Sequence, residues 1–392
     1  MKLPLGYRYA ATYAGIRSSE EDDVALIVPD TIAQAAAVFT RNVVQAAPVR
    51  IAKRHLKSSS GKVAAILVNA GNANCATRTG ERVALASCKA VAKALRTRSE
   101  YILPASTGVI GVELESRRLI DIAPKLVARL SRDAFEAAAR AILTTDTRIK
   151  VASEEIRLGG DTVCIAGMTK GAGMIHPKMA TTLGFVMMDA TIGPNHLRQM
   201  LSSAIDPTYC ALTVDGDTST NDMVAVLANG ASGVTPSTKQ RRTLQELMTC
   251  VMESLARQIA ADGEGARKLI MVHALGFKRE DEARTVARSV ANSLLVKTAI
   301  AGSDPNWGRI LAAAGYSGIA FDSSDVDIYL QEVPVCRHGL AADFDEAELK
   351  RKLDQAEVHI RIVLNGRGKS QARFFTCDLT EEYVKVNASF RS

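Results

Sequence analysis

The segment from residue 170 to residue 185 combines residue types that can carry out chemistry. A glycine-rich stretch, 170–174, leads through a proline to Ala180 and Thr181, which stand directly before an apolar run. A threonine hydroxyl is a weak nucleophile, but cleavage of the peptide bond before it frees an α-amine that can act as its base. The glycines permit the strained backbone that attack of Thr181 Oγ on the preceding carbonyl requires. The pattern fits an N-terminal nucleophile, and it also fits an ordinary strand start.

Short apolar runs rich in β-branched residues predict the strands that position this segment. Several of these runs are apolar at every position, as expected when both faces of a sheet are covered. The predicted strands lie at residues 66–68, 163–166, 182–188, 224–227, 269–272, 326–329 and 359–364. The first of them enters a polar turn at 69–74.

Two predicted helices each carry one apolar stripe at the spacing of helical turns, so each packs one face against a layer below. The stripe of the first helix is Ala84, Cys88, Val91 and Leu95. The stripe of the second, longer helix is Leu244, Leu247, Val251, Leu255 and Ile259. Helices packed on buried strands predict an α/β fold, a sandwich of layered sheets and helices.

The chain is long enough for more than one core. Its 392 residues exceed the ~250 to 300 at which a single core usually stops growing, so two lobes or closely packed layers are expected. Apolar residues make up 47% of the chain and charged residues 23%, which is ordinary for a folded globular protein. The charged stretch 278–284 is predicted to join a smaller lobe that runs from about residue 283 to 392.

Composition also narrows the class of protein. The net charge is +7, but basic residues alternate with acidic ones and form no block, so we expect no nucleic-acid partner. Pro4, Gly6 and Arg8 interrupt the N-terminus and no long apolar stretch follows, so we expect no membrane segment or export signal. Seven scattered cysteines without Cys-x-x-Cys spacing argue against disulfides and a zinc site. A cytoplasmic protein is predicted.

Two motifs resemble ligand-binding loops but lack an essential residue. The stretch 366–370 ends like a phosphate-binding loop, but Val363 stands where that loop has its first glycine. The stretch 215–222 opens like a calcium loop, but Thr220 replaces its glycine and Val226 replaces its bidentate glutamate. No histidine pair has metal-ligand spacing, and no Gly-x-Ser-x-Gly elbow is present. We therefore expect no metal and no cofactor.

A series of distinct short motifs is spread along nearly the whole chain. They are Ala37-Val-Phe-Thr-Arg41, Asn69-Ala-Gly-Asn-Ala-Asn74, Ser106-Thr-Gly-Val-Ile-Gly111, Thr144-Thr-Asp-Thr147, Lys170-Gly-Ala-Gly-Met174, Met179-Ala-Thr181, Asp215-Gly-Asp-Thr-Ser-Thr220, Asp262-Gly-Glu-Gly265, Asp304-Pro-Asn-Trp-Gly-Arg309 and Cys377-Asp-Leu-Thr380. With these motifs the chain resembles the ornithine acetyltransferase family, also described as the arginine-biosynthesis bifunctional glutamate N-acetyltransferases. The resemblance implies an α-β-β-α-like sandwich of the ornithine acetyltransferase type.

The same resemblance implies self-cleavage between Ala180 and Thr181. An α chain of residues 1–180 and a β chain of residues 181–392 would stay together, two of each in one assembly. The segment before the predicted cleavage point departs from the family, because His176-Pro-Lys178 stands where its members often have another residue, then proline, then Asn or Asp.

Matching positions to the family's motifs implies a set of site residues. Thr181 would be the nucleophile, and Thr107 with Gly108 would form the oxyanion hole, although Ser-Thr-Gly taken alone also fits a plain turn. The implied substrate-binding residues are Thr144, Lys170, Thr181, Glu264, Asn387 and Ser392. A lysine can pair with a substrate carboxylate and a glutamate with a substrate ammonium, which suits an amino acid.

The activity implied is transfer of the acetyl group of N-alpha-acetylornithine to L-glutamate through a Thr181 acyl-enzyme, in arginine biosynthesis. No cofactor is required, and acetyl-CoA remains open as a second acetyl donor. Two alternatives also remain open from the residues. One is an N-terminal nucleophile amidohydrolase or aminopeptidase, in which water accepts the acyl group, and the other is a non-catalytic scaffold of the same fold.

Overall fold

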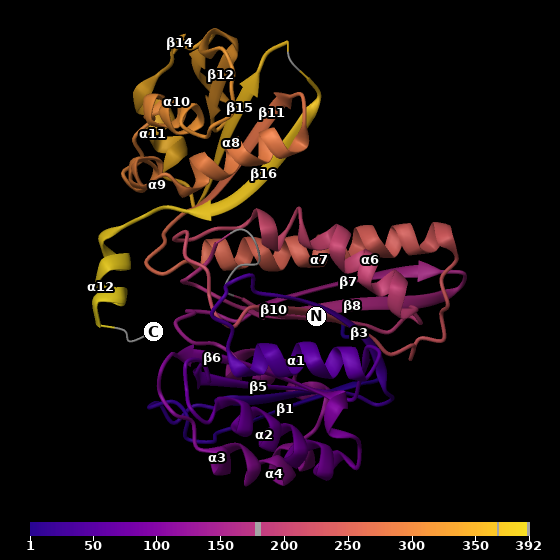
Figure 1. Cartoon of the computed structure of the whole chain (residues 1–392). Helices are drawn as coiled ribbons and strands as arrows, with labels where there is room; N and C mark the ends of the chain where they lie inside the picture. The colour runs from indigo at the N-terminus through magenta and orange to yellow at the C-terminus, as the bar shows by residue number, and fades with distance from the viewer. Residues whose placement is uncertain (177–181, 367, 390–392) are drawn as a thin grey trace.

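The computed structural model describes residues 1–176, 182–366 and 368–389. Its three β-sheets and their helices are stacked in layers, with the C-terminal sheet at one end of the molecule (Figure 1). Within the described part of the chain, no helix has the length and apolar character needed to cross a membrane.

The first sheet has four strands in the order β1-β2-β5-β6. They are β1 (Tyr7–Thr12), β2 (Val24–Pro29), β5 (Ala65–Asn72) and β6 (Ile102–Val109). Strands β5 and β6 are parallel, with α2 (Gly80–Leu95) between them in the chain. Residues 69–71, predicted to be part of a polar turn, lie within β5 and pair with the Ser-Thr-Gly sequence of the parallel β6, so the two stretches lie side by side.

The second sheet has six strands in the order β4-β3-β10-β9-β8-β7. They are β3 (Ala33–Phe39), β4 (Lys62–Val63), β7 (Lys150–Leu158), β8 (Asp161–Lys170), β9 (Leu183–Met188) and β10 (Met223–Ala228). Antiparallel β8 and β9 pair Lys170 with Leu183, and parallel β9 and β10 pair Leu183 with Met223. The end of β8 and the starts of β9 and β10 therefore meet at one edge of this sheet.

The two sheets pack face to face through a shared apolar core. Tyr9, Ile27 and Val68 from the first sheet meet Phe185 and Leu227 from the second, all of them buried. Helices cover the outer faces: α2 and its neighbours pack on the first sheet, and α6 (Pro194–Ile205) and α7 (Thr238–Ala261) pack on the second (Figure 1). This α-β-β-α order of layers confirms the predicted fold class.

The remaining helices of this sandwich are mostly short. They are α1 (Ala47–Ser58), α3 (Ser116–Ile120), α4 (Ala123–Ala128) and α5 (Phe135–Ala141). The long helix α7 buries four of the five predicted stripe residues, whereas Leu247 is only partly buried and the neighbouring Met248 is buried. The stripe of α2 is likewise buried at Ala84, Cys88 and Val91 and only partly at Leu95.

The third sheet has the strand order β14-β13-β12-β15-β11-β16. Its strands are β11 (Leu269–Phe277), β12 (Val326–Leu330), β13 (Val333–Arg337), β14 (Leu340–Ala341), β15 (Glu357–Leu364) and β16 (Ser370–Cys377). The helices around it are α8 (Glu280–Asn292), α9 (Leu294–Ala301), α10 (Trp307–Gly315) and α11 (Glu346–Leu353). They share a second apolar core with the sheet.

The boundary predicted for a C-terminal lobe is wrong by one strand. Strand β11 is already a central strand of the third sheet, so this unit begins near Leu269 and not near residue 283. The stretch 278–284, predicted to join two lobes, holds the first turns of α8. Its acidic residues fit there because negative charge at a helix N-terminus is stabilised by the helix dipole.

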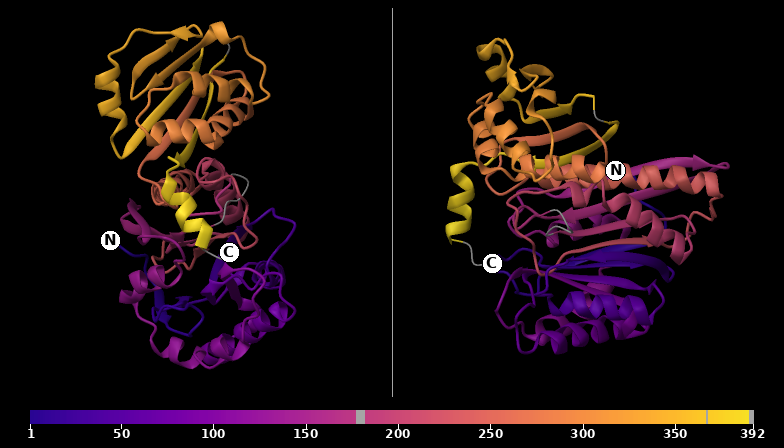
Figure 2. Two further views of the ribbon diagram at one scale, coloured as in Figure 1. Left: turned by 90° about the vertical axis from the view of Figure 1, so that its left-hand side faces the viewer. Right: turned by 45° about the horizontal axis from the view of Figure 1, so that its top comes forward.

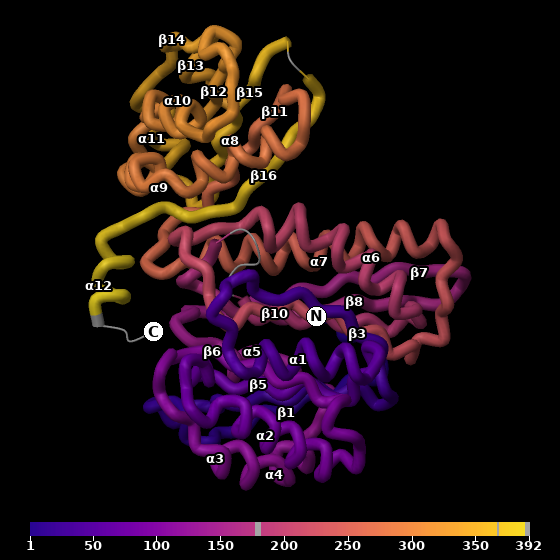
Figure 3. Tube along the Cα trace, in the orientation of Figure 1, coloured from indigo at the N-terminus to yellow at the C-terminus, as the bar shows by residue number. Residues whose placement is uncertain are grey.

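The chain returns from the third sheet to the sandwich. After β16, a short connection leads to α12 (Glu381–Ser389), which lies beside the sandwich and away from the third sheet (Figures 2 and 3). The C-terminal helix therefore lies at the same end of the sandwich as the strand edges described above.

Each strand predicted from the sequence is present, with bounds shifted by a few residues.

Candidate functional site

A pocket of about 180 Å³ lies where the strand edges of the two sandwich sheets meet the loop after α7 and helix α12. Most of the side chains around it are polar. Its lining residues are Thr107, Gly108, Ile110, Thr144, Thr145, Lys170, Gly173, Met174, Asp215, Asp217, Ser219, Thr220, Asn221, Glu264, Tyr383 and Asn387. Such a lining suits a small polar ligand better than an apolar one.

One wall of the pocket is the end of β6, where Thr107 and Gly108 lie. Gly108 has a φ of +127°, a conformation that side chains with a Cβ rarely adopt. A Cβ at this position would lie 2.2 Å from the Gly71 carbonyl carbon and 2.5 Å from the Asn72 amide nitrogen. The close approach of β5 and β6 therefore requires glycine here.

Asn221 fixes this wall from the second sheet. Its Nδ2 donates to the carbonyl oxygens of Ala73, at 2.7 Å, and Ser106, at 2.8 Å. A buried side-chain amide that satisfies two carbonyl groups holds both strand ends in place. The position of Thr107, next to Ser106, is thus set by both sheets.

Lys170, the last residue of β8, reaches the same wall from the opposite side. Its side chain is buried, and Nζ donates to Thr107 Oγ1 at 3.1 Å. Its backbone carbonyl accepts a hydrogen bond from Thr182 Oγ1 at 2.6 Å, and the Thr182 amide donates to Asp222 Oδ1 at 2.9 Å. Thr182, the chain neighbour of Thr181, is therefore anchored beside Lys170 and Asp222.

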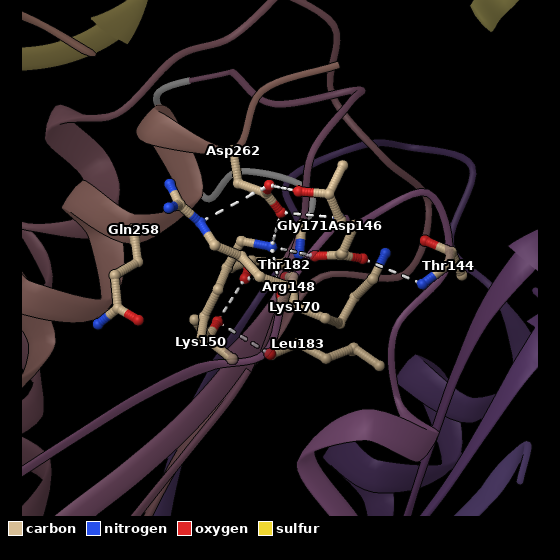
Figure 4. Close-up of polar contacts among 12 residues, drawn as sticks. Thr144, Asp146, Arg148, Lys150, Lys170, Gly171, Thr182, Leu183, Gln258 and Asp262 are labelled. Atoms are coloured by element: carbon tan, nitrogen blue, oxygen red, sulfur yellow. Dashed lines mark hydrogen bonds and ion pairs between the residues drawn. The ribbon is translucent and has the colours of Figure 1, made fainter. Parts of the chain in front are cut away.

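A buried ionic network stands behind Lys170 (Figure 4). The Lys150 Nζ donates to Asp146 Oδ1 at 2.6 Å and to Asp262 Oδ2 at 2.5 Å. Asp146 also accepts hydrogen bonds from the amides of Gly171, at 2.6 Å, and Thr144, at 3.0 Å. The network thereby joins the start of β7 to the loop after β8 and to one edge of the pocket.

Glu264 and Asn387 form the opposite side of the pocket. Asn387 Nδ2 of α12 donates to Glu264 Oε2 at 2.8 Å, so the C-terminal helix contributes directly to the site. Gly173 lets the carboxylate approach, since a Cβ at this position would lie 2.3 Å from Glu264 Oε2. The glycine-rich loop is therefore shaped around this glutamate.

Asp215 holds the loop that precedes residue 177. Its carboxylate accepts hydrogen bonds from the amides of Met174, at 2.5 Å, and Ile175, at 2.9 Å, and from Asp217 N at 3.1 Å. The Tyr383 hydroxyl donates to it at 3.5 Å. A carboxylate that accepts hydrogen bonds from several backbone amides holds their loop in one conformation. The stretch that resembled a calcium loop thus uses its first aspartate to shape the pocket.

The charges around Lys170 shift one another's pKa values. Burial lowers the pKa of the Lys170 ammonium, and the nearby Asp146 carboxylate opposes that shift. Burial also raises the pKa of Asp222 well above its ordinary value, and the Thr182 amide opposes it. Burial acts on Asp146 in the same direction, but the Lys170 and Lys150 charges outweigh it and hold its pKa at about 2. Strongly perturbed groups beside a pocket are typical of functional sites.

The pocket collects most of the residues predicted from the sequence. Those that line it are Thr107, Gly108, Thr144, Lys170, Glu264 and Asn387. Ala180, Thr181 and Ser392 lie outside the described residues. Sequence reasoning gave no role to Asp146, Asp215, Asn221 or Tyr383. The first three lie within or directly after the sequence motifs at 144–147 and 215–220, and this position could have indicated a role in the site.

The fold and the pocket define a layered α/β protein with a small polar site at the edge of its paired sheets. Comparison with known proteins identifies the family. The ArgJ family model matches residues 8–392. The arginine biosynthesis bifunctional protein ArgJ of Thermosynechococcus vestitus is 44% identical over 404 residues, covering 98% of this chain and 96% of that protein. The protein of the same name from Nitratidesulfovibrio vulgaris is also 44% identical, with 99% of each chain covered.

The chain belongs to the ArgJ family and is an enzyme, as the resemblance of its sequence motifs predicted. A solved structure of the arginine biosynthesis bifunctional protein ArgJ from Bacillus halodurans is also similar, with 40% identity and a TM-score of 0.51. That match covers 98% of the Bacillus chain but only 53% of this one.

Proposed function

We propose that this enzyme transfers the acetyl group of N-alpha-acetylornithine to L-glutamate in arginine biosynthesis, through an acyl-enzyme on Thr181. The observation that supports this most strongly is the convergence of Thr107, Gly108, Lys170 and Glu264 on one polar pocket. The anchored Thr182, next in the chain to Thr181, lies beside Lys170. Family membership supports the role in arginine biosynthesis.

The nucleophile forms by self-cleavage between Ala180 and Thr181. The new α-amine takes the proton of the Thr181 hydroxyl as its oxygen attacks the acetyl carbonyl, giving a tetrahedral oxyanion. The C–N bond to ornithine then breaks, and the same amine delivers the proton to the leaving nitrogen. The neutral amine of glutamate attacks the resulting ester and gives a proton to the Thr181 α-amine, which passes it to Thr181 Oγ as the C–O bond breaks, so acetylglutamate leaves and the hydroxyl is restored. No cofactor takes part in these steps.

Thr107 and Gly108 supply the oxyanion hole in this proposal. A donor aimed at the developing oxyanion is typically worth ~3 to 4 kcal/mol of the activation barrier. The constrained φ of Gly108 and the fixed end of β6 support this role, because they hold the two residues without reorganisation. A preorganised site of this kind stabilises the transition state more than the bound substrate.

Glu264 is the proposed partner of a substrate ammonium. Its carboxylate lines the pocket, and Asn387 orients it through a 2.8 Å hydrogen bond. Thr144 and Ser392 complete the proposed substrate-binding set. N-acetylornithine carries a free side-chain ammonium with which this carboxylate can pair, whereas the α-amine of glutamate must be neutral to attack the ester. Donor and acceptor both react at Thr181, so they occupy the pocket in turn. The reaction is then expected to be ping-pong.

We further propose that the two cleaved chains stay assembled, as two α and two β chains in the cytoplasm, and that acetyl-CoA is a second acetyl donor. The Bacillus halodurans match supports cleavage within the family, since nearly all of that solved chain aligns with about half of this one. The packing of the second sheet supports continued assembly, because β9 and β10, from after residue 180, lie between β3 and β8, from before it.

Intact-mass measurement of the purified protein tests this proposal. We expect two fragments, and incubation with N-acetylornithine should add the mass of one acetyl group to the 181–392 fragment, which glutamate then removes. Thr181→Ala should give one uncut, inactive chain, whereas Thr181→Ser should still cleave. Acetyl loss to water at the same rate without glutamate would indicate an amidohydrolase. An uncut parent chain without an acetyl adduct would indicate a scaffold.

A further inference from the structure

Lys170 makes an unusual contact for a residue predicted to bind substrate. Its side chain is only 4% exposed, and Thr107 Oγ1, at 3.1 Å, is the one hydrogen-bond partner recorded for Nζ among the described residues. The predicted role of Lys170 was to pair with a substrate carboxylate. The observed partner is instead the hydroxyl of the proposed oxyanion hole.

The chemistry of this contact fixes the direction of the Thr107 hydroxyl. An ammonium group has three N–H donors and no acceptor, so Thr107 Oγ1 must be the acceptor. Its own hydrogen then points away from Nζ. A hydroxyl that accepts from a cation is also polarised and becomes a stronger donor, as in other hydrogen-bond chains within a protein. Because Thr107 lines the pocket, that strengthened donor is available to a ligand there.

The backbone on both sides of Lys170 is held in place. Its carbonyl accepts from Thr182 Oγ1 at 2.6 Å, and the amide of the next residue, Gly171, donates to Asp146 Oδ1 at 2.6 Å. Asp146 is itself bonded to Lys150. The ammonium therefore extends from a fixed base toward Thr107, as an orienting group requires.

We propose that Lys170 serves acetyl transfer through Thr107: its buried ammonium orients and polarises the Thr107 hydroxyl as an oxyanion donor. Lys170 is thus a positioning residue for the Thr107 hydroxyl. The inference rests on the function proposed above. The titratable groups around the ammonium are Asp146, Lys150, Asp222 and Glu264. The acidic members of this set favour the charged form that the role needs.

A double-mutant cycle tests the coupling of the two residues. The variants are Lys170→Met, Thr107→Val and the pair, and the measurement is the rate of acetylation of the 181–392 fragment by N-acetylornithine, per mole of cleaved chain. Thr107→Val should lower the rate roughly a hundredfold or more with little change in KM. If Lys170 acts through Thr107, adding Lys170→Met to Thr107→Val should change the rate less than threefold. Multiplicative losses would overturn the inference.

A matched control and a second substrate sharpen the test. Asn387→Ala, which removes a neutral group of the pocket that touches neither Thr107 nor Lys170, should combine multiplicatively with Thr107→Val. N-acetylputrescine lacks the α-carboxylate of N-acetylornithine but keeps its acetylated amine. Lys170→Met should slow both substrates by the same factor, whereas a carboxylate-binding lysine would affect only N-acetylornithine.

Conservative variants cover the case in which the others fail to cleave. Lys170→Arg keeps a cationic donor and should retain more activity than Lys170→Met, and it should move the alkaline fall in rate to higher pH. Equal rates for the two Lys170 variants, or an alkaline fall in the Lys170→Arg rate at the same pH as in the parent, would contradict the inference. An absent acetyl adduct on the parent chain would overturn the proposed function itself, whereas a normal adduct with multiplicative losses would overturn this inference alone.

Discussion

Lys150 and Lys170 are two buried lysines at the same edge of the second sheet, and their surroundings differ. Lys150 donates to two carboxylates, Asp146 and Asp262, and to the Arg148 carbonyl at 3.4 Å. Lys170 donates to a neutral hydroxyl that lines the pocket. The Lys150 region is a neutralised ionic network, whereas the Lys170 region keeps a cation whose acidic neighbours do not bond to it directly within the described residues.

The difference separates a structural use of charge from a chemical one. A buried ion that is fully paired is costly to separate from its partner, and its neutralised charge has little effect on a ligand nearby. A buried ion next to a neutral hydroxyl keeps much of its electrostatic effect for whatever enters the pocket, since the low-dielectric surroundings screen it weakly. The two lysines are linked by Asp146, so the structural network supports the chemical one.

Removing Lys150 should have the largest effect on stability. Lys150→Met leaves Asp146 and Asp262 buried without their main counter-ion, and loss of one partner of a buried pair typically costs about 3 to 5 kcal/mol. Lys170→Met breaks one hydrogen bond to a hydroxyl and removes one of the two cations near Asp146, which stays bonded to Lys150, so it should cost less than Lys150→Met. Denaturant unfolding at pH 7 measures both, with cleavage of each variant checked on a gel. Equal losses would show that the two regions do not differ as described.

Replacing Asp146 should have the next largest effect on stability, and the size of this effect depends on pH. The folded pKa of Asp146, about 2, lies below its ordinary value of 3.8, so its contribution to stability is complete above pH 4 and is lost as the pH falls toward 2. That shift corresponds to roughly 2 to 3 kcal/mol. Asp146→Asn should therefore be destabilised by this amount at pH 7 and approach the parent protein near pH 2.5.

Unfolding free energies of parent and variant across this pH range provide the measurement. Asp161→Asn, at an exposed aspartate at the start of β8, is the matched control and should follow the parent throughout. A difference between Asp146→Asn and the parent that stays constant with pH would contradict the assigned charge state of Asp146.

The elements of the fold were largely predictable from the sequence because their signals are local. A β-branched run or an apolar stripe such as that of α7 is set by residues within a few turns of one another. The lobe boundary failed for the same reason: the charged residues 278–284 look like a linker locally, and only the pairing of β11 with β15 and β16 places them inside the third unit.

The polar contacts of the site were not predictable from local signals. The bond from Lys170 joins residues 63 positions apart, and the bond from Lys150 to Asp262 joins residues 112 apart. Family motifs placed Thr107 and Glu264 at a site, but sequence alone does not say which donor meets which acceptor. The substrate-binding role of Lys170 stays a prediction, and its contact with Thr107 is one that the sequence did not indicate.

The contribution of Asp222 to stability should change with pH in the opposite direction to that of Asp146, although both carboxyl groups interact with Lys170. Burial raises the folded pKa of Asp222 above its ordinary value. As the pH rises past that ordinary value, the unfolded chain loses the proton while the folded chain keeps it, so the contribution of Asp222 to stability falls with rising pH. An asparagine keeps an oxygen that can accept from the Thr182 amide and has no proton to lose.

Asp222→Asn should therefore lie within about 1 kcal/mol of the parent at pH 4, where both side chains are neutral in the folded state. Between pH 4 and pH 7 it should gain stability relative to the parent, since the parent alone is penalised for keeping a proton there. Denaturant unfolding of the two proteins at both pH values, in the same cleaved state, gives the difference. A variant that loses stability relative to the parent as the pH rises would mean that Asp222 is a charged, stabilising carboxylate. Asp146 and Asp222 would then no longer differ in the direction in which pH changes their contributions to stability.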